Sequence, residues 1–166
     1  MRNFLTVFAV TCLAFAPAAM AQDAEMSDAE RIARDYMTAY SEVDFERMGT
    51  FMAEDIVFSD TTAPGTNSPN GLEGRTRDSA LALLNEFAEQ YNPIELGFVW
   101  DTVFESNNRV IFMGYVNALY PTDQAGQVFR WRAEQATVVT VIDGQVVRHQ
   151  DFANYTGVEQ GLVAAE

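Results

Sequence analysis

Helical patterns followed by strand patterns predict a single α+β domain. Apolar residues recur at helical spacing through residues 27–91, whereas the segments after Pro93 are rich in Val, Phe, Tyr, Trp and Thr. The pair Asp143-Gly144 between two apolar segments is typical of a two-residue type I′ hairpin turn. The chain has 166 residues and no internal repeat, so we expect helices packed on an antiparallel sheet within one domain.

The start of the chain is predicted to be a secretory signal peptide, residues 1–21. Arg2 gives a positively charged start, and residues 4–15 form an apolar run that is too short to span a membrane. Small residues at Ala19 and Ala21 match the positions that a signal peptidase reads, so cleavage is expected after Ala21. We therefore expect the mature domain, residues 22–166, in the periplasm or the medium, without a membrane anchor.

The composition excludes several kinds of site. The chain has 24 acidic and 10 basic residues and a formal net charge of −14, and such a chain repels the phosphates of nucleic acids. All 10 basic residues are Arg, which excludes Schiff-base chemistry and a Walker-type phosphate loop because both need Lys. One Cys and one His cannot form a Cys/His zinc site or an intrachain disulfide. We expect no nucleic-acid partner, no metal and no cofactor.

The first two helices are marked by capping residues. Ser27 precedes the first apolar stripe, and Glu30 is placed to complete a capping box with it. Asp44 is the second capping candidate, and the helix that follows it is expected to end at residues 53–55. Residues 56–60 (Ile-Val-Phe-Ser-Asp) are then predicted to form the first strand.

A loop, a third helix and the remaining strands follow. Residues 61–74 are rich in Thr, Pro, Gly and Asn, so we expect no helix or strand there, and the length of the segment is typical of a lid or rim. From Thr76 to Tyr91 apolar residues return at helical spacing, and Asn92-Pro93 ends the helix. The rest is predicted to form four antiparallel strands at residues 96–105, 109–120, 128–142 and 145–155.

The order of these elements and several short segments are distinctive. The segments are residues 33–36 (Ala-Arg-Asp-Tyr), 43–44, 52–55, 58–60 and, near the end, 148–152 (Arg-His-Gln-Asp-Phe). Together they resemble the NTF2-like superfamily, in particular its SnoaL-like and ketosteroid isomerase-like members, over nearly the whole mature chain. The resemblance implies an NTF2-like cone, in which three N-terminal helices pack on a curved antiparallel β-sheet. It also implies a homodimer, because such sheets often pair.

The resemblance implies roles for particular side chains. Tyr36 matches the ketosteroid isomerase tyrosine that donates to the developing oxyanion, and Asp60 matches the general base of that enzyme, with no gap between them. Asp151 lies where SnoaL-like cyclases carry an acid on the last strand, and His149 precedes it on the same strand face. The third isomerase residue is a protonated aspartic acid, and at its expected place this chain offers only Thr137 as a donor.

Three classes of function fit these residues. The candidate catalytic residues are Asp60, Tyr36, Asp151 and His149, which in an apolar pocket could move protons on a small hydrophobic molecule, as a cofactor-free isomerase or cyclase does. Epoxide hydrolysis is not expected, because residues 113–117 lack the Arg and second Asp of that mechanism. The alternatives are a non-catalytic binding module for a small hydrophobic ligand and a dimeric protein-interaction domain.

Each candidate residue also has a structural explanation. Asp60 could cap the turn at Thr61-Thr62, and Tyr36 could be a core residue whose hydroxyl bonds to backbone. His149 could serve only as the structural partner of Asp151. The two sets of explanations differ in whether the side chains line one cavity.

Overall fold

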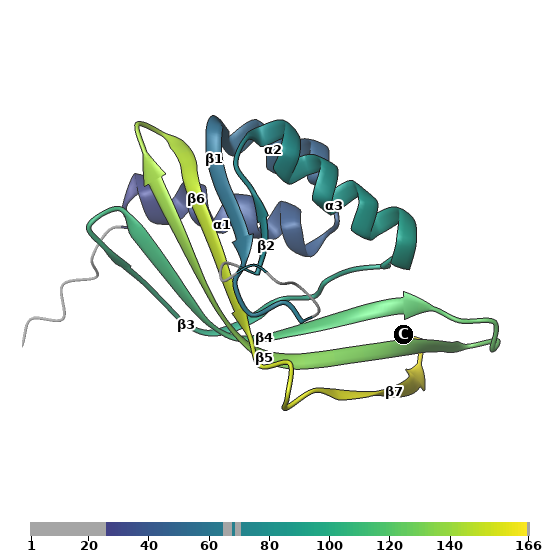
Figure 1. Ribbon diagram of the computed structural model, residues 1–166. Helices are drawn as coiled ribbons and strands as arrows, with labels where there is room; N and C mark the ends of the chain where they lie inside the picture. Colours follow the sequence, from purple (N-terminus) through teal and green to yellow (C-terminus); the bar gives the residue numbers. More distant parts are fainter. Residues whose placement is uncertain (1–25, 65–67, 69–70, 166) are drawn as a thin grey trace, which may run out of the picture.

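The computed structural model describes residues 26–64, 68 and 71–165, which form three helices packed on one curved sheet (Figure 1). The α+β class and the NTF2-like architecture are confirmed, whereas the predicted signal peptide lies outside the described residues. Within the described residues no helix is long and apolar enough to cross a membrane. The elements are α1 (Asp28–Ser41), α2 (Phe45–Phe51), β1 (Met52–Asp60), β2 (Leu72–Gly74), α3 (Arg77–Tyr91), β3 (Val99–Ser106), β4 (Arg109–Pro121), β5 (Gln127–Ile142), β6 (Gln145–Ala153) and β7 (Glu159–Ala164).

The first two helices begin at the expected capping residues. The Ser27 side chain accepts a hydrogen bond from the backbone N–H of Glu30 at 3.0 Å, and Asp44 accepts one from the N–H of Arg47 at 3.0 Å. The Glu30 carboxylate pairs with Arg34 at 2.7 Å rather than reaching back to the cap. Both caps satisfy backbone donors that the first turn of a helix leaves without partners.

Two strands and one helix end differ from the prediction. α2 ends at Phe51, and residues 53–55 lie in β1, because Met52 already pairs with Val146 of β6. β2 occupies the end of the predicted loop, where it pairs antiparallel with the last residues of β1. β7 follows the last predicted strand and pairs antiparallel with the first part of β5. In each case a neighbouring strand supplies the hydrogen bonds that the local sequence does not indicate.

The sheet is mixed rather than wholly antiparallel. Its strand order is β2-β1-β6-β5-β4-β3, with β7 also paired to β5. The run from β3 to β6 is antiparallel as predicted, and Asp143 and Gly144 have φ values of 49° and 78°, as a type I′ turn requires. β1, however, joins β6 in parallel, and the pairing register between these two strands shifts between Met52 and Val57.

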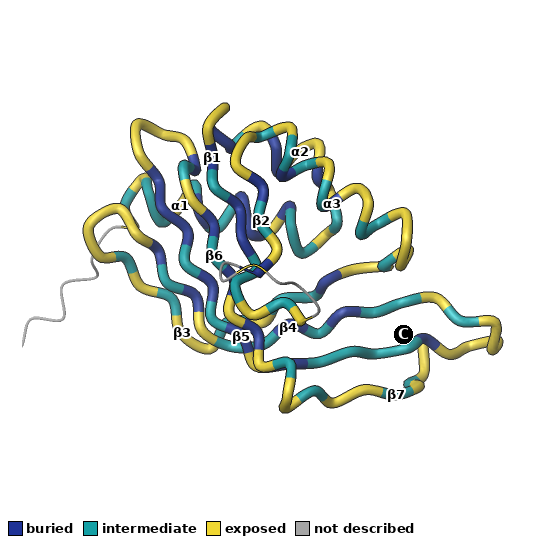
Figure 2. The backbone as a smooth tube through the Cα atoms, viewed as in Figure 1, coloured by how far each residue is buried: buried dark blue, intermediate teal, exposed yellow. Residues whose placement is uncertain are grey.

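The sheet curves around the helices. In Figure 1 the ends of β4 and β5, together with β7, extend away from the remaining strands and face the C-terminal end of α3. Figure 2 shows buried residues along β1, β6 and the neighbouring parts of α1 and α2. The main core includes Tyr36, Met48, Phe58 and Phe112, and a smaller cluster of Leu96, Val116, Ala118 and Ala133 lies farther along β4 and β5.

Candidate functional site

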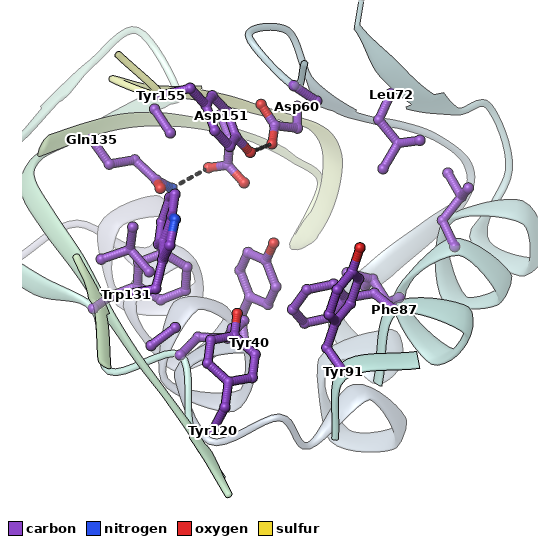
Figure 3. A pocket seen from close by; sticks show the side chains of 18 of the residues that line it. Tyr40, Asp60, Leu72, Phe87, Tyr91, Tyr120, Trp131, Gln135, Asp151 and Tyr155 are labelled. Carbon is purple, nitrogen blue, oxygen red and sulfur yellow. Dashed lines mark hydrogen bonds between the residues drawn. The ribbon is translucent and has the colours of Figure 1, made fainter. Parts of the chain in front are cut away.

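A cavity of about 780 Å³ lies between the concave face of the sheet and α3 (Figure 3). Its volume is within the range of small-molecule pockets, and its walls are mainly apolar, as such pockets usually are. The start of the loop after β1 contributes Ala63 and Pro64 to the rim. The aromatic residues that line the cavity are Tyr40, Phe58, Phe87, Tyr91, Phe98, Tyr120, Phe129, Trp131 and Tyr155.

Two carboxyl groups enter this cavity from adjacent strands. Asp60 is the last residue of β1, Asp151 lies in β6, and the parallel pairing places them directly opposite one another. Neighbouring strands lie about 4.8 Å apart, and residues in register point to the same face of a sheet. The sequence predicted both acids as site residues, and the structure brings them to the same cavity.

Asp151 is held by hydrogen bonds from β5. Its Oδ1 accepts a hydrogen bond from the Thr137 hydroxyl at 2.5 Å and another from Nε2 of Gln135 at 2.8 Å. Thr137 lies directly opposite Asp151 in the antiparallel pairing of β5 with β6. The side chain is 5% exposed. These two donors therefore fix the orientation of a buried carboxyl.

Asp60 faces the cavity and also caps the turn that follows β1. Its Oδ2 accepts a hydrogen bond from the Tyr155 hydroxyl, and its Oδ1 accepts from the N–H and the hydroxyl of Thr62, both at 3.3 Å. Burial raises the pKa of Asp60, the hydrogen bond from Tyr155 lowers it, and the charge of Asp151 raises it again. The net effect is a raised pKa, which suits proton transfer closer to neutral pH.

Tyr36 and His149 lie behind the cavity wall. Both are fully buried, and neither is among the residues that line the cavity. Nε2 of His149 lies 2.8 Å from Oδ2 of Asp151, whereas Nδ1 of His149 and the Tyr36 hydroxyl have no hydrogen-bond partner among the described residues. The imidazole stacks on Phe58 with ring centroids 4.5 Å apart. The structure thus places His149 beside Asp151 on its core side and Tyr36 next to His149, with ring centroids 5.6 Å apart.

Tyr40, one helical turn after Tyr36, is the tyrosine of α1 that reaches the cavity. Figure 3 shows its ring below the two carboxyl groups, with the hydroxyl pointing toward them. Burial raises the pKa of Tyr40 well above its ordinary value, and the charge of Asp151 adds to this effect. Its phenol therefore stays protonated, which makes it a hydrogen-bond donor for a ligand.

Sequence reasoning missed Tyr40, Gln135 and Tyr155. Tyr40 belongs to the same apolar stripe as Tyr36, so only the packing of α1 shows which of them meets the cavity. Gln135 shares a strand face with Thr137, and that alternation is a signal that could have found it. Tyr155 lies in the turn after β6, where no periodic pattern indicates its direction.

The family of SnoaL-like domains matches residues 33–149 of the chain. The protein belongs to this SnoaL-like domain family. The matched region contains Tyr36, Asp60 and His149 and ends shortly before Asp151. No curated protein matches the chain.

Solved structures share the fold of this SnoaL-like protein at low sequence identity. A proposed SnoaL-like polyketide cyclase from Shewanella putrefaciens CN-32 has a TM-score of 0.66 at 19% identity, covering 89% of this chain and 94% of that one. The Δ5-3-ketosteroid isomerase from Mycobacterium sp. has a TM-score of 0.65 at 16% identity, covering 82% of this chain and 100% of the other. At these identities the similarity shows the fold alone.

Proposed function

We propose that this SnoaL-like domain is a cofactor-free enzyme that moves a proton on a small hydrophobic molecule, as an isomerase or cyclase does. One observation carries the proposal: Asp60 and Asp151 enter the same apolar cavity side by side from paired strands. Burial raises the pKa of one of these acids, Asp60. A base with a raised pKa inside a water-poor pocket is what abstraction of a proton from carbon requires.

The side chains suggest a division of roles. The Asp60 carboxylate takes a proton from a carbon that lies between a carbonyl group and a C=C bond. The electron pair of the broken C–H bond forms a new C=C bond, and the π electrons of the carbonyl group move to its oxygen. The Tyr40 hydroxyl then donates a hydrogen bond to the enolate oxygen. Protonated Asp60 returns the proton to a second carbon, which completes an isomerisation. In this proposal Tyr36 and His149 support Asp151 from behind the cavity wall and do not touch the substrate.

Deuterium exchange tests this proposal without knowledge of the natural substrate. Hydrophobic cyclic ketones, including a Δ5-3-ketosteroid, are incubated with the protein in D₂O, and mass spectrometry follows incorporation at carbon. We expect exchange with at least one ketone, and a loss of about 10²–10⁴-fold in Asp60→Asn, the usual contribution of a general base. The control is Asp101→Asn, which changes an exposed acid on β3 and should leave the rate unchanged.

A non-catalytic binding module is the second candidate. Two observations favour it: Thr137 and Gln135 already occupy one oxygen of Asp151, and the third acid of the ketosteroid isomerases is absent. A ketone that binds the cavity without any exchange over hours would support the binding module and contradict the enzyme.

We also propose that the mature domain acts outside the cytoplasm. The support is the sequence pattern of residues 1–21, with small residues at Ala19 and Ala21. Mass spectrometry of protein recovered from the periplasm or the medium should find Gln22 at the N-terminus. Intact protein that still carries Met1 and remains in the cytoplasm would contradict export.

A further inference from the structure

The charged side chains that the structure describes at the cavity are both acids. Among the described residues that line it, Asp60 and Asp151 carry the ionisable carboxyls, and none is Arg, Lys or His. Residues 61–74, only part of which the structure describes, contain no basic residue either. An anionic ligand would therefore lose its hydration beside two acids and gain no opposite charge in return.

Asp151 has neutral hydrogen-bond donors and no cationic partner on the cavity side. Thr137 and Gln135, which hold its Oδ1, are both uncharged. On the core side, Nε2 of His149 lies 2.8 Å from Oδ2 of Asp151, where a protonated imidazole forms an ion pair with the carboxylate. Buried carboxylates are usually paired with a positive group. Asp60 and Asp151 meet no positively charged residue among the described residues that line the cavity, so a positive group on a ligand would supply that charge from the cavity side.

Aromatic rings surround the two acids. Figure 3 shows Tyr40 below them and Trp131 beside Gln135, and the rings of Trp131 and Tyr155 lie 5.7 Å apart between centroids. The faces of such rings attract ammonium groups, and they also stack against apolar rings. Phe87 and Tyr91 extend the apolar wall along α3. The cavity thus has an acidic end and an apolar end.

We propose that the cavity binds a hydrophobic amine in its protonated form, with the ammonium group between Asp151 and Tyr40 and the ring body against the aromatic walls. This inference rests on the proposed function, because it names the substrate class for the same cavity. In it Asp151 recognises the positive charge, which leaves Asp60 free to transfer a proton.

Three ligands with one ring system and different charges test the inference. Naphthylmethylamine, naphthylmethanol and naphthoate are titrated into the purified protein at pH 7 by isothermal calorimetry. We expect the amine to bind on the order of ten-fold tighter than the alcohol, as a charge-assisted hydrogen bond implies, and the carboxylate not to bind. Asp151→Asn should remove the preference for the amine, and the control Asp101→Asn should keep it.

Equal affinity for amine and alcohol, or binding of naphthoate as tight as that of the amine, would overturn the inference. If Asp151→Asn does not fold, the ratio of amine affinity to alcohol affinity in the unaltered protein still tests the inference, because that measurement needs no substitution. Deuterium exchange separates this inference from the proposed function. Tighter binding of the amine without deuterium exchange supports the ligand class and contradicts the proposed enzyme. Deuterium exchange without tighter binding of the amine supports the proposed enzyme and contradicts the ligand class.

Discussion

The Asp60 side chain both stabilises the turn after β1 and faces the cavity. It accepts hydrogen bonds from Thr62 in the turn and from Tyr155, and it faces the cavity. Its pKa in the folded protein lies above the ordinary value of 3.8, chiefly because of burial. The folded state therefore binds the proton more tightly than the unfolded state does, so stability is lost as pH rises through this range.

Replacing Asp60 by Asn should stabilise the protein at neutral pH. The variant Asp60→Asn keeps an oxygen that accepts from Tyr155 but never carries the buried charge, so we expect Tm to rise by a few degrees at pH 7. The gain should vanish at pH 3, below the ordinary pKa, where the carboxyl is protonated in both states. Thermal unfolding followed by circular dichroism measures both values. A lower Tm for the variant at pH 7 would contradict the view that the partly buried charge of Asp60 destabilises the folded state.

The hydrogen bond from the Tyr155 hydroxyl should keep the pKa of Asp60 lower than it would be without that bond. Because its hydrogen bond lowers the pKa of Asp60, we expect the midpoint of the Asp60 carboxyl in ¹³C NMR to move to higher pH in Tyr155→Phe. Any activity that needs ionised Asp60 should then begin at higher pH as well. The matched control is Tyr91→Phe, which removes a hydroxyl from the cavity wall without touching Asp60. An unchanged midpoint in Tyr155→Phe would refute the role.

The side chains of the site differ in how far the sequence alone could identify them. Asp60 and Asp151 were named from the resemblance to ketosteroid isomerases and SnoaL-like cyclases, and a charged side chain within a strand pattern gave Asp151 a further reason to face inward; both reach the cavity, and their part in catalysis stays a prediction. Tyr36 and Tyr40 could not be distinguished, because both fit the apolar stripe of α1 and only packing decides which is enclosed. Whether Tyr36 and His149 contribute to catalysis stays a prediction.

At the scale of elements, the long strands and the helices with clear caps could be predicted, and the short paired segments could not. β2 has only three residues, Leu72–Gly74, so neither alternation nor length identifies it. β7 is an edge strand that depends on β5 for its hydrogen bonds. Both strands exist because a partner strand is already in place, which is information that no local window of sequence contains.

Close contact between β3 and β4 should make Gly114 intolerant of a side chain. A Cβ atom at Gly114 would lie 2.0 Å from the carbonyl oxygen of Val99, whereas one at Gly161 would meet nothing within 4 Å. We expect Gly114→Ala to lower the free energy of unfolding by about 1–3 kcal/mol or more, as overpacking does. Gly161→Ala, in β7, is the control and should change it by no more than about 0.5 kcal/mol. Urea unfolding compares the two, and equal stabilities would argue against this strand pairing.

For the whole molecule, the order of helices and strands was sufficient to predict the architecture, but not the mixed sheet. Parallel pairing of β1 with β6 joins residues far apart in the chain, and no turn between neighbouring strands reveals it. The cavity is likewise a product of the whole curved sheet, since its lining comes from helices α1 and α3, from β1, β2, β4, β5 and β6 and from segments between these elements.

The predicted homodimer should form through the outer face of the sheet. Phe104 and Met113, each 46% exposed, and Phe152, 41% exposed, lie on this face. Exposed apolar side chains of this kind mark interaction surfaces. We expect sedimentation to show a dimer, and Met113→Glu to give a monomer with the cavity intact. The control Ile94→Glu changes an exposed apolar residue outside the strands and should keep the dimer, whereas a monomeric unaltered protein would exclude this interface.

The shift in pairing between Met52 and Val57 has a consequence for the evolution of such chains. Met52 lies opposite Val146 and Val57 opposite Arg148, so β1 accommodates extra residues before it regains register with β6. Deleting one residue from this stretch should shorten the bulge and leave the pairs from Val57–Arg148 to Asp60–Asp151 in place, because the extra residues have no partner on β6. Homologues of this fold can therefore differ in length before Val57 without moving Phe58 or Asp60 out of the cavity.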